Sequence, residues 1–157
     1  MEYIQRLRNV MKSADIEPFI RHIRFPFFKN LAEGCKVDFN YPITAFVGQN
    51  GTNKSSVLRA LFGSPNNYSL GSLWFSTDVD EIKDEGRSRF IYGYFDAPTK
   101  SIVEVIKTRI SKEEDPDYWE PSRPIRSDDM APMPEKILSH NQLKTRWKAI
   151  DKNVISV

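Results

Sequence analysis

The sequence predicts an α/β fold in which a β-sheet surrounds a strand, a glycine-containing loop and a helix, and three observations lead to that prediction. A short apolar run at residues 43–47 lies between Pro42 and Gly48 and has the composition of a buried strand. A polar loop follows it, and residues 54–63 have helical spacing. Further along, residues 89–96 and 101–110 are two predicted strands joined by a turn at 97–100, and the second alternates in side-chain character, which predicts an antiparallel hairpin.

The chain before this unit predicts one helix and two strands. Residues 2–14 carry a narrow apolar stripe on a basic helix, which we expect to pack on a neighbouring surface or a partner chain. Strands are predicted at 19–25 and 35–39, with Ile23 and Phe25 on one face of the first strand and His22 and Arg24 on the other. The turn between the two strands contains Lys29, next to phenylalanines that can bury and fix it.

The loop at 48–56 has the residue types that bind phosphate. Glycine at 48 and 51 lets backbone amides turn toward phosphate oxygens, and the helix that begins near Lys54 directs its free N–H groups and positive dipole end at the same anion. Lys54 supplies a charge for the outer phosphates, and Ser55 is placed to bind a magnesium ion that bridges them. The predicted nucleotide contacts in the loop are Gly48, Gln49, Asn50, Gly51, Thr52, Asn53, Lys54, Ser55 and Ser56.

Asn53 departs from the pattern G-x-x-x-x-G-K-[ST], which has glycine at this position. Asparagine is the residue other than glycine that best tolerates left-handed backbone angles, so the loop can still close. The competing interpretation is a simple Gly/Asn turn between a strand and a helix.

The order of these parts resembles the N-terminal ATP-binding lobe of ABC-type ATPases of the SMC and RecF kind. The resemblance covers residues 19–63 and rests on the aromatic-Lys-Asn turn and on Asn50-Gly51 within the loop. The loop also looks like that of RecF-like, AAA-labelled ATPases of bacterial defence operons. The resemblance implies a P-loop NTPase fold with an antiparallel β subdomain after the helix, which the hairpin at 89–110 would form. It also implies ATP and Mg²⁺ as ligands, Lys29 near the nucleotide phosphates, and pairing with a second copy or a partner subunit through the ATPase head.

The remainder of the chain is predicted in four parts. Gly63 is expected to end the helix in a left-handed conformation. In the hairpin, Lys107 and Arg109 are placed on the solvent side. Residues 112–134 form a proline-rich irregular insertion, in which Tyr118 and Trp119 are interpreted as part of a satellite core. Residues 135–148 are weakly helical, and 154–157 resemble the start of another strand. The predicted units are therefore 1–15, 16–111, 112–134 and 135–157.

The family's apolar strand ending in Asp-Glu and its Ser-Gly-Gly signature are absent from the sequence. We therefore expect this chain to be the first part of a longer ATPase and to have no ATP turnover on its own. The alternative is a self-contained module that binds a nucleotide without cleaving it. A small P-loop kinase is a third interpretation, but it would need an arginine-rich lid that the proline-rich stretch does not resemble.

Composition limits the other function classes. The first 62 residues carry a net charge of +4 and residues 78–120 a net charge of −5, so an anionic ligand explains the basic part as well as nucleic acid would. A single cysteine, Cys35, excludes an intrachain disulfide, and the histidines His22 and His140 are interpreted as structural. There is no apolar run of membrane length and no signal-peptide pattern, so we expect a cytoplasmic protein without a membrane partner.

Overall fold

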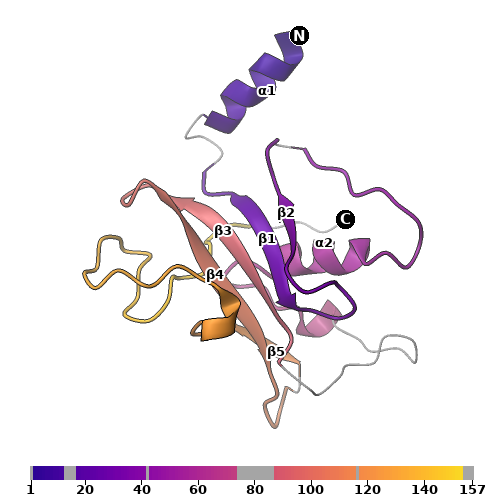
Figure 1. The fold of residues 1–157 in the computed structure, drawn as a ribbon, viewed down its shortest axis with the longest axis vertical. Coiled ribbons are helices and arrows are strands. Elements are labelled where there is room, and N and C mark those ends of the chain that lie inside the picture. Colours follow the sequence, from indigo (N-terminus) through magenta and orange to yellow (C-terminus); the bar gives the residue numbers. More distant parts are fainter. Residues whose placement is uncertain (1, 13–16, 42, 74–86, 116, 154–157) are drawn as a thin grey trace.

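The computed structural model describes residues 2–12, 17–41, 43–73, 87–115 and 117–153, and its centre is a five-stranded antiparallel sheet (Figure 1). The strands are β1 (Ile20–Phe27), β2 (Cys35–Asp38), β3 (Arg89–Asp96), β4 (Ser101–Ile110) and β5 (Tyr118–Pro121), in the spatial order β2-β1-β3-β4-β5. The helices are α1 (Glu2–Lys12) and α2 (Lys54–Phe62), and the 3-10 turns are η2 (Gly71–Leu73) and η3 (Arg126–Asp128). The chain therefore has an α/β fold, as the sequence predicts.

The hairpin of β3 and β4 forms the middle of this sheet. The two strands pair along their whole overlap, from Arg89 opposite Thr108 to Asp96 opposite Ser101. Both strands have the bounds that the sequence predicts. Because β1 pairs with β3, the hairpin and the N-terminal strands belong to one continuous sheet and not to a separate subdomain.

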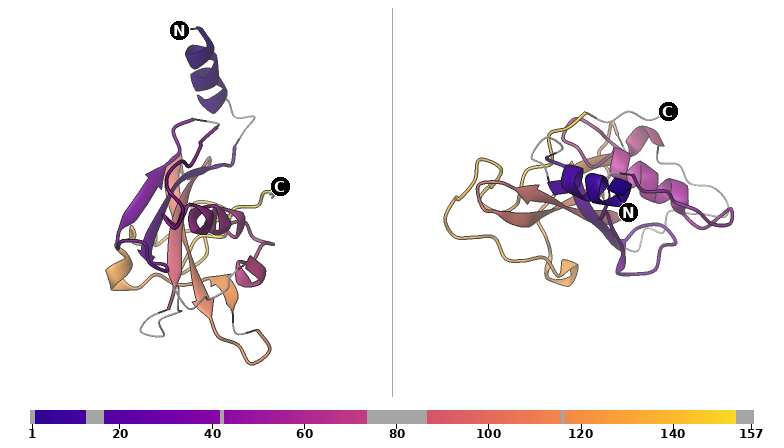
Figure 2. Two further views of the ribbon diagram at one scale, coloured as in Figure 1. Left: turned by 90° about the vertical axis from the view of Figure 1, so that its right-hand side faces the viewer. Right: turned by 90° about the horizontal axis from the view of Figure 1, so that it is seen from above.

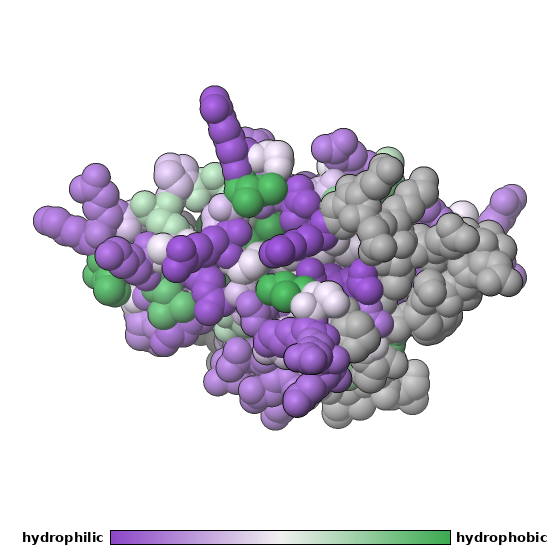
Figure 3. Space-filling model, turned by 90° about the horizontal axis from the view of Figure 1, so that it is seen from below, coloured by the Kyte–Doolittle hydropathy of each residue, from purple (hydrophilic) through white to green (hydrophobic). Residues whose placement is uncertain are grey.

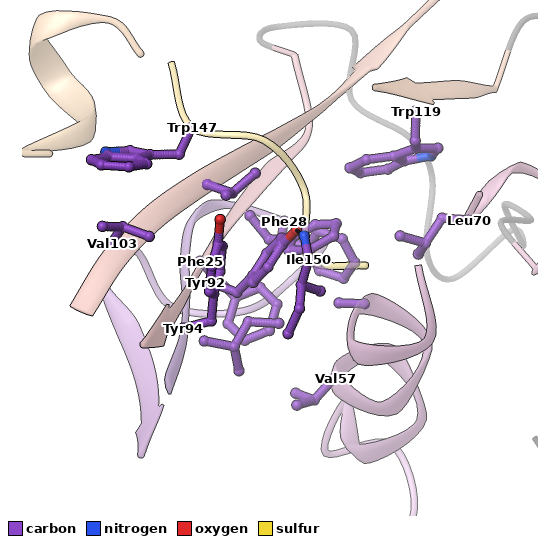
Figure 4. Packing of buried hydrophobic residues seen from close by; sticks show 14 residues of the cluster. Phe25, Phe28, Val57, Leu70, Tyr92, Tyr94, Val103, Trp119, Trp147 and Ile150 are labelled. Atoms are coloured by element: carbon purple, nitrogen blue, oxygen red, sulfur yellow. Dashed lines mark hydrogen bonds between the residues drawn. The ribbon is translucent and has the colours of Figure 1, made fainter. Parts of the chain in front are cut away.

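One face of the sheet packs against α2 and the segment that ends at Ile150 (Figure 2). In α2, Val57 and Ala60 point toward the sheet because they lie three residues apart on one side of the helix. The strands present a row of buried side chains to them, most of them aromatic or β-branched (Figure 4). These are Ile23 and Phe25 of β1, Phe90, Tyr92 and Tyr94 of β3, and Val103 and Val105 of β4.

An aromatic cluster closes the end of the core near β5. The ring of Phe28 lies 5.9 Å from that of Phe90 in an edge-to-face arrangement, and Trp119 lies 5.8 Å from Phe28 and 5.7 Å from Phe90. Such pairs stabilise a core by about 0.5–1.5 kcal/mol each beyond the area that they bury. The prediction of a core role for Trp119 is therefore confirmed, whereas the prediction that 112–134 is irregular is wrong at β5 and η3.

The opposite face of the sheet is more polar. It carries His22 and Arg24 from β1 and Glu104 from β4, and η3 lies against it through Arg24 and Arg89 (Figure 2). Seen from below, the coloured part of the surface is mostly hydrophilic, with its hydrophobic residues in small separate patches (Figure 3).

The strand predicted at 43–47 is not formed. These residues are extended without ladder partners among the described residues, and Ile43 and Val47 are 81% and 88% exposed. Phe46 alone turns inward, where its ring lies 6.4 Å from that of Phe39. An apolar run becomes a strand only when a neighbouring strand exchanges hydrogen bonds with it, and none of the described strands pairs with this one.

The helix predicted at 135–148 is also absent. Residues 135–153 are irregular, with one isolated bridge between Gln142 and Trp147. Ser139 and Asn141 direct their side chains to the carboxylate of Asp96, at 2.8 and 2.9 Å, instead of continuing a helix. The aromatic run at 74–75 and the strand expected at 154–157 lie outside the described residues.

Helix α1 confirms the predicted N-terminal helix and ends at Lys12. It extends away from the sheet (Figure 1), and Tyr3 and Ile4 are 79% and 52% exposed. No described helix has the length and apolar character that crossing a membrane requires.

Candidate functional site

The loop before α2 is shaped by three residues with left-handed backbone angles. Gly48 has φ of 149°, Gly51 has φ of 82°, and Asn53 has φ of 59° with ψ of 17°. Side chains are costly at such angles, and glycine and asparagine are the residues that adopt them most readily. Asn53 therefore takes the conformation for which the motif has glycine, and α2 begins at the next residue, as predicted.

Lys54 folds back over this loop. Its ammonium group donates hydrogen bonds to the carbonyl oxygens of Gly48 and Gln49, at 2.9 and 2.6 Å, and lies 3.3 Å from the hydroxyl of Thr52. The Thr52 hydroxyl in turn donates to the carbonyl of Gln49 at 2.9 Å. The loop and the lysine thus form one hydrogen-bonded unit, with the cation held on the loop side of the helix.

The remaining predicted contacts lie around this unit. Asn50 and Ser55 are exposed, and Ser55 lies on the first turn of α2. Ser56 is buried, and its hydroxyl lies 3.5 Å from the side-chain oxygen of Asn53, so it braces the start of the helix. Lys29 has φ of 49° in the turn after β1 and is not among the residues joined by these loop hydrogen bonds.

The charge distribution on α2 leaves its N-terminus open to an anion. The first turn contains no acidic residue that would compensate the positive end of the helix dipole, and Arg59 occupies the last turn. The unpaired amides of a first helical turn and the dipole end both attract negative charge. The loop at Lys54 is therefore exposed and electropositive.

The other end of α2 is fixed by a buried lysine that the sequence pattern placed in solvent. Lys107 of β4 is 1% exposed, and its ammonium group donates to the carbonyls of Gly63, Pro65 and Tyr68 at 2.6, 2.8 and 3.0 Å. Burial lowers the pKa of Lys107 to about 8, so it is still mainly protonated at pH 7. The prediction of a solvent-facing side chain is wrong because carbonyls at the end of α2 replace water as hydrogen-bond acceptors.

Two further contacts hold the same helix end. The hydroxyl of Tyr92 donates to the carbonyl of Ser64 at 2.7 Å, and the hydroxyl of Ser64 donates to the carbonyl of Ala60 at 2.8 Å. Gly63 has φ of −79° and not the predicted left-handed angle. Its lack of a side chain matters for another reason, because a Cβ there would lie 2.4 Å from Leu70.

A second polar cluster lies on the opposite face of the sheet. The carboxylate of Glu104 accepts two hydrogen bonds from Arg24, at 2.8 and 2.7 Å, and lies 2.8 Å from Nε2 of His22. Gly93 makes this possible, because a Cβ there would lie 2.3 Å from the His22 ring. Burial would raise the pKa of Glu104, but the bonds from Arg24 and His22 outweigh it and lower that pKa to about 2. The sequence interpretation of His22 as structural fits this position beside Glu104.

Among the described residues, no group of three or more histidine, cysteine, aspartate or glutamate side chains is arranged to hold a metal ion. Comparison of the chain with protein-family models, curated proteins and solved structures finds no significant match. The function is therefore argued from the loop itself.

Proposed function

We propose that residues 48–56 bind the phosphates of ATP together with Mg²⁺. In this proposal Lys54 leaves the loop carbonyls and contacts the outer phosphates, while the amides of the loop and of the first turn of α2 surround them. Ser55 contributes its hydroxyl to the magnesium ion. Lys29 approaches from the turn after β1, as the resemblance to SMC and RecF-like ATPases implies.

The observation that carries the proposal is the conformation of Asn53. A simple Gly/Asn turn does not require a left-handed residue immediately before the lysine, whereas a phosphate-binding loop needs one to direct successive amides inward. This conformation supports a loop backbone that is already shaped for an anion. A preformed loop loses little conformational entropy on binding.

The proposal covers binding alone. Cleavage would also need a group that activates water, and the 157 residues lack the apolar strand ending in Asp-Glu that supplies it in the resembling ATPases. Assembly of two ATPase heads, or of this chain with a partner subunit, belongs to the same proposal.

Titration calorimetry with Mg-ATP tests it. Replacing Lys54 by alanine removes a charged contact to phosphate, which is worth about 2–3 kcal/mol, so Lys54→Ala should bind about 30- to 150-fold more weakly. Lys100→Ala is the matched control, since Lys100 is an exposed lysine in the turn between β3 and β4. Equal affinities for the wild type and Lys54→Ala would refute the proposal.

A further inference from the structure

The outer edge of β4 is only partly covered. β5 pairs with residues 107–110 of β4, whereas β3 pairs with residues 101–108 on the other side. The outer edge of 101–105 therefore has no ladder partner among the described strands, and Ile102 is 53% exposed.

The direction of the backbone groups on this edge follows from two hydrogen bonds. The carbonyl of Ile106 accepts from the amide of Ser122 on the β5 side, at 3.0 Å, whereas the amide of Arg109 donates to Ser88 on the β3 side, at 2.8 Å. Successive residues of a strand direct their backbone groups to opposite sides. Ile102 and Glu104 therefore direct theirs outward like Ile106, and the described backbone contacts give neither of them a partner there.

Beyond the bond from Ser122 to Ile106, the chain that follows β5 does not extend the ladder along β4. Prolines at 124, 132 and 134 lack the amide hydrogen that a strand in this position would donate. Instead, this segment passes around the β4 side of the sheet (Figure 2). Between the segment and the strand lies a cavity of about 760 Å³, lined by Ile102, Ile106, Met130, Met133, Arg146 and Trp147 among others.

The charges along this cavity favour an acidic ligand. Its two carboxylates are already paired, Glu104 with Arg24 and Asp38 with Lys36 at 2.8 Å. Arg146 donates to the carbonyl of Pro121, and no carboxylate within the described part of the chain pairs with it. A cation that no carboxylate neutralises lowers the energy of a negative charge placed near it.

We propose that the outer edge of β4 is a strand-addition site for an extended peptide in which apolar residues alternate with acidic ones. The backbone of the peptide would exchange hydrogen bonds with Ile102 and Glu104. Its apolar side chains would pack between Met130, Met133 and Trp147, and an acidic side chain would meet Arg146. This site is independent of the proposed nucleotide loop, which lies on α2.

Peptide selection on the full 157-residue chain tests the site. A display library of random seven-residue peptides is the probe, and the most enriched peptides are synthesised for binding measurements. Ile102→Pro removes an outward amide without removing a bond to β3, and Ile102→Thr is its matched control because it keeps that amide. Arg146→Gln removes the charge.

If the proposal is correct, the enriched peptides alternate apolar and acidic residues. They should bind Ile102→Pro at least tenfold more weakly than Ile102→Thr, and Arg146→Gln at least tenfold more weakly than the wild type. Hydrogen exchange on the wild-type chain gives a readout that does not depend on the folding of a variant: bound peptide should slow exchange at the amides of Ile102 and Glu104.

Three results would overturn the site: no enrichment above an unrelated control protein, peptides that leave the exchange of Ile102 and Glu104 unchanged, or binding equal in Ile102→Thr and Ile102→Pro. Self-association that Ile102→Pro abolishes would overturn it too, because the occupant of the edge would then be a second copy of this chain.

Discussion

Replacing Glu104 by glutamine should destabilise the protein at neutral pH and have little effect in strong acid. The hydrogen bonds from Arg24 and His22 lower the pKa of Glu104 from its ordinary value of 4.5 to about 2. Each unit of difference from the unfolded chain corresponds to about 1.4 kcal/mol, so the ionised carboxylate stabilises the fold by about 3 kcal/mol. The side chain is 21% exposed, so solvent screens this contribution only in part.

The sign of the pH dependence follows from the direction of the shift. Because the folded-state pKa lies below the unfolded one, the stabilisation is complete above about pH 4.5 and is lost as the pH falls toward 2. Glutamine keeps the shape of the side chain but has no charge to lose. The difference in unfolding free energy between the wild type and Glu104→Gln should therefore be about 2–3 kcal/mol at pH 7 and close to zero at pH 2.

Urea denaturation followed by tryptophan fluorescence at several pH values measures this difference. Glu120→Gln is the matched control, because Glu120 is 38% exposed and lies 3.6 Å from Lys112. Its effect should stay within about 0.5 kcal/mol. Equal unfolding free energies of the wild type and Glu104→Gln at pH 7, or a difference that is the same at pH 7 and pH 2, would contradict this prediction.

Three further predictions concern α2 and its loop. Lys107→Met leaves three buried carbonyls without their donor and should lower the free energy of unfolding by about 2–4 kcal/mol in urea denaturation; an unchanged midpoint would contradict this. Asn53→Gly should keep the Mg-ATP affinity within about threefold. Asn53→Val must adopt φ near 59°, which should cost about 1–3 kcal/mol in stability or binding. Equal behaviour of the two variants would show that this conformation is not needed. Lys29→Ala should weaken ATP binding by about 1 kcal/mol and ADP binding less, because a partly exposed contact to the outermost phosphate is screened; equal losses for the two nucleotides would place Lys29 outside the site.

The sequence was most informative where structure depends on neighbouring residues. The bounds of β3 and β4 follow from two runs rich in β-branched and aromatic residues and the turn between them, and α2 begins where the loop pattern predicts it. The left-handed angle at Asn53 could be predicted because few residue types tolerate it.

The predictions from sequence are wrong where the local structure depends on distant parts of the chain. Residues 43–47 have the composition of a strand, but pairing needs a neighbouring strand that local composition does not reveal. Lys107 lies on the same face of β4 as the buried Val103 and Val105, and its charge is accommodated there because its acceptors lie 39 to 44 residues earlier in the chain. In the same way, Asp96 binds the side chains of Ser139 and Asn141, more than 40 residues later, where local spacing predicted a helix.

The central claim, that residues 48–56 hold nucleotide phosphates, is tested most directly by amide NMR spectra of the ¹⁵N-labelled chain during addition of Mg-ATP. We predict that the largest shifts occur at the amides of Gly48, Gly51, Lys54 and Ser55, and that the same titration of Lys54→Ala gives much smaller shifts at equal nucleotide concentration. Shifts confined to the polar face of the sheet around Glu104, or no shifts at millimolar Mg-ATP, would contradict it.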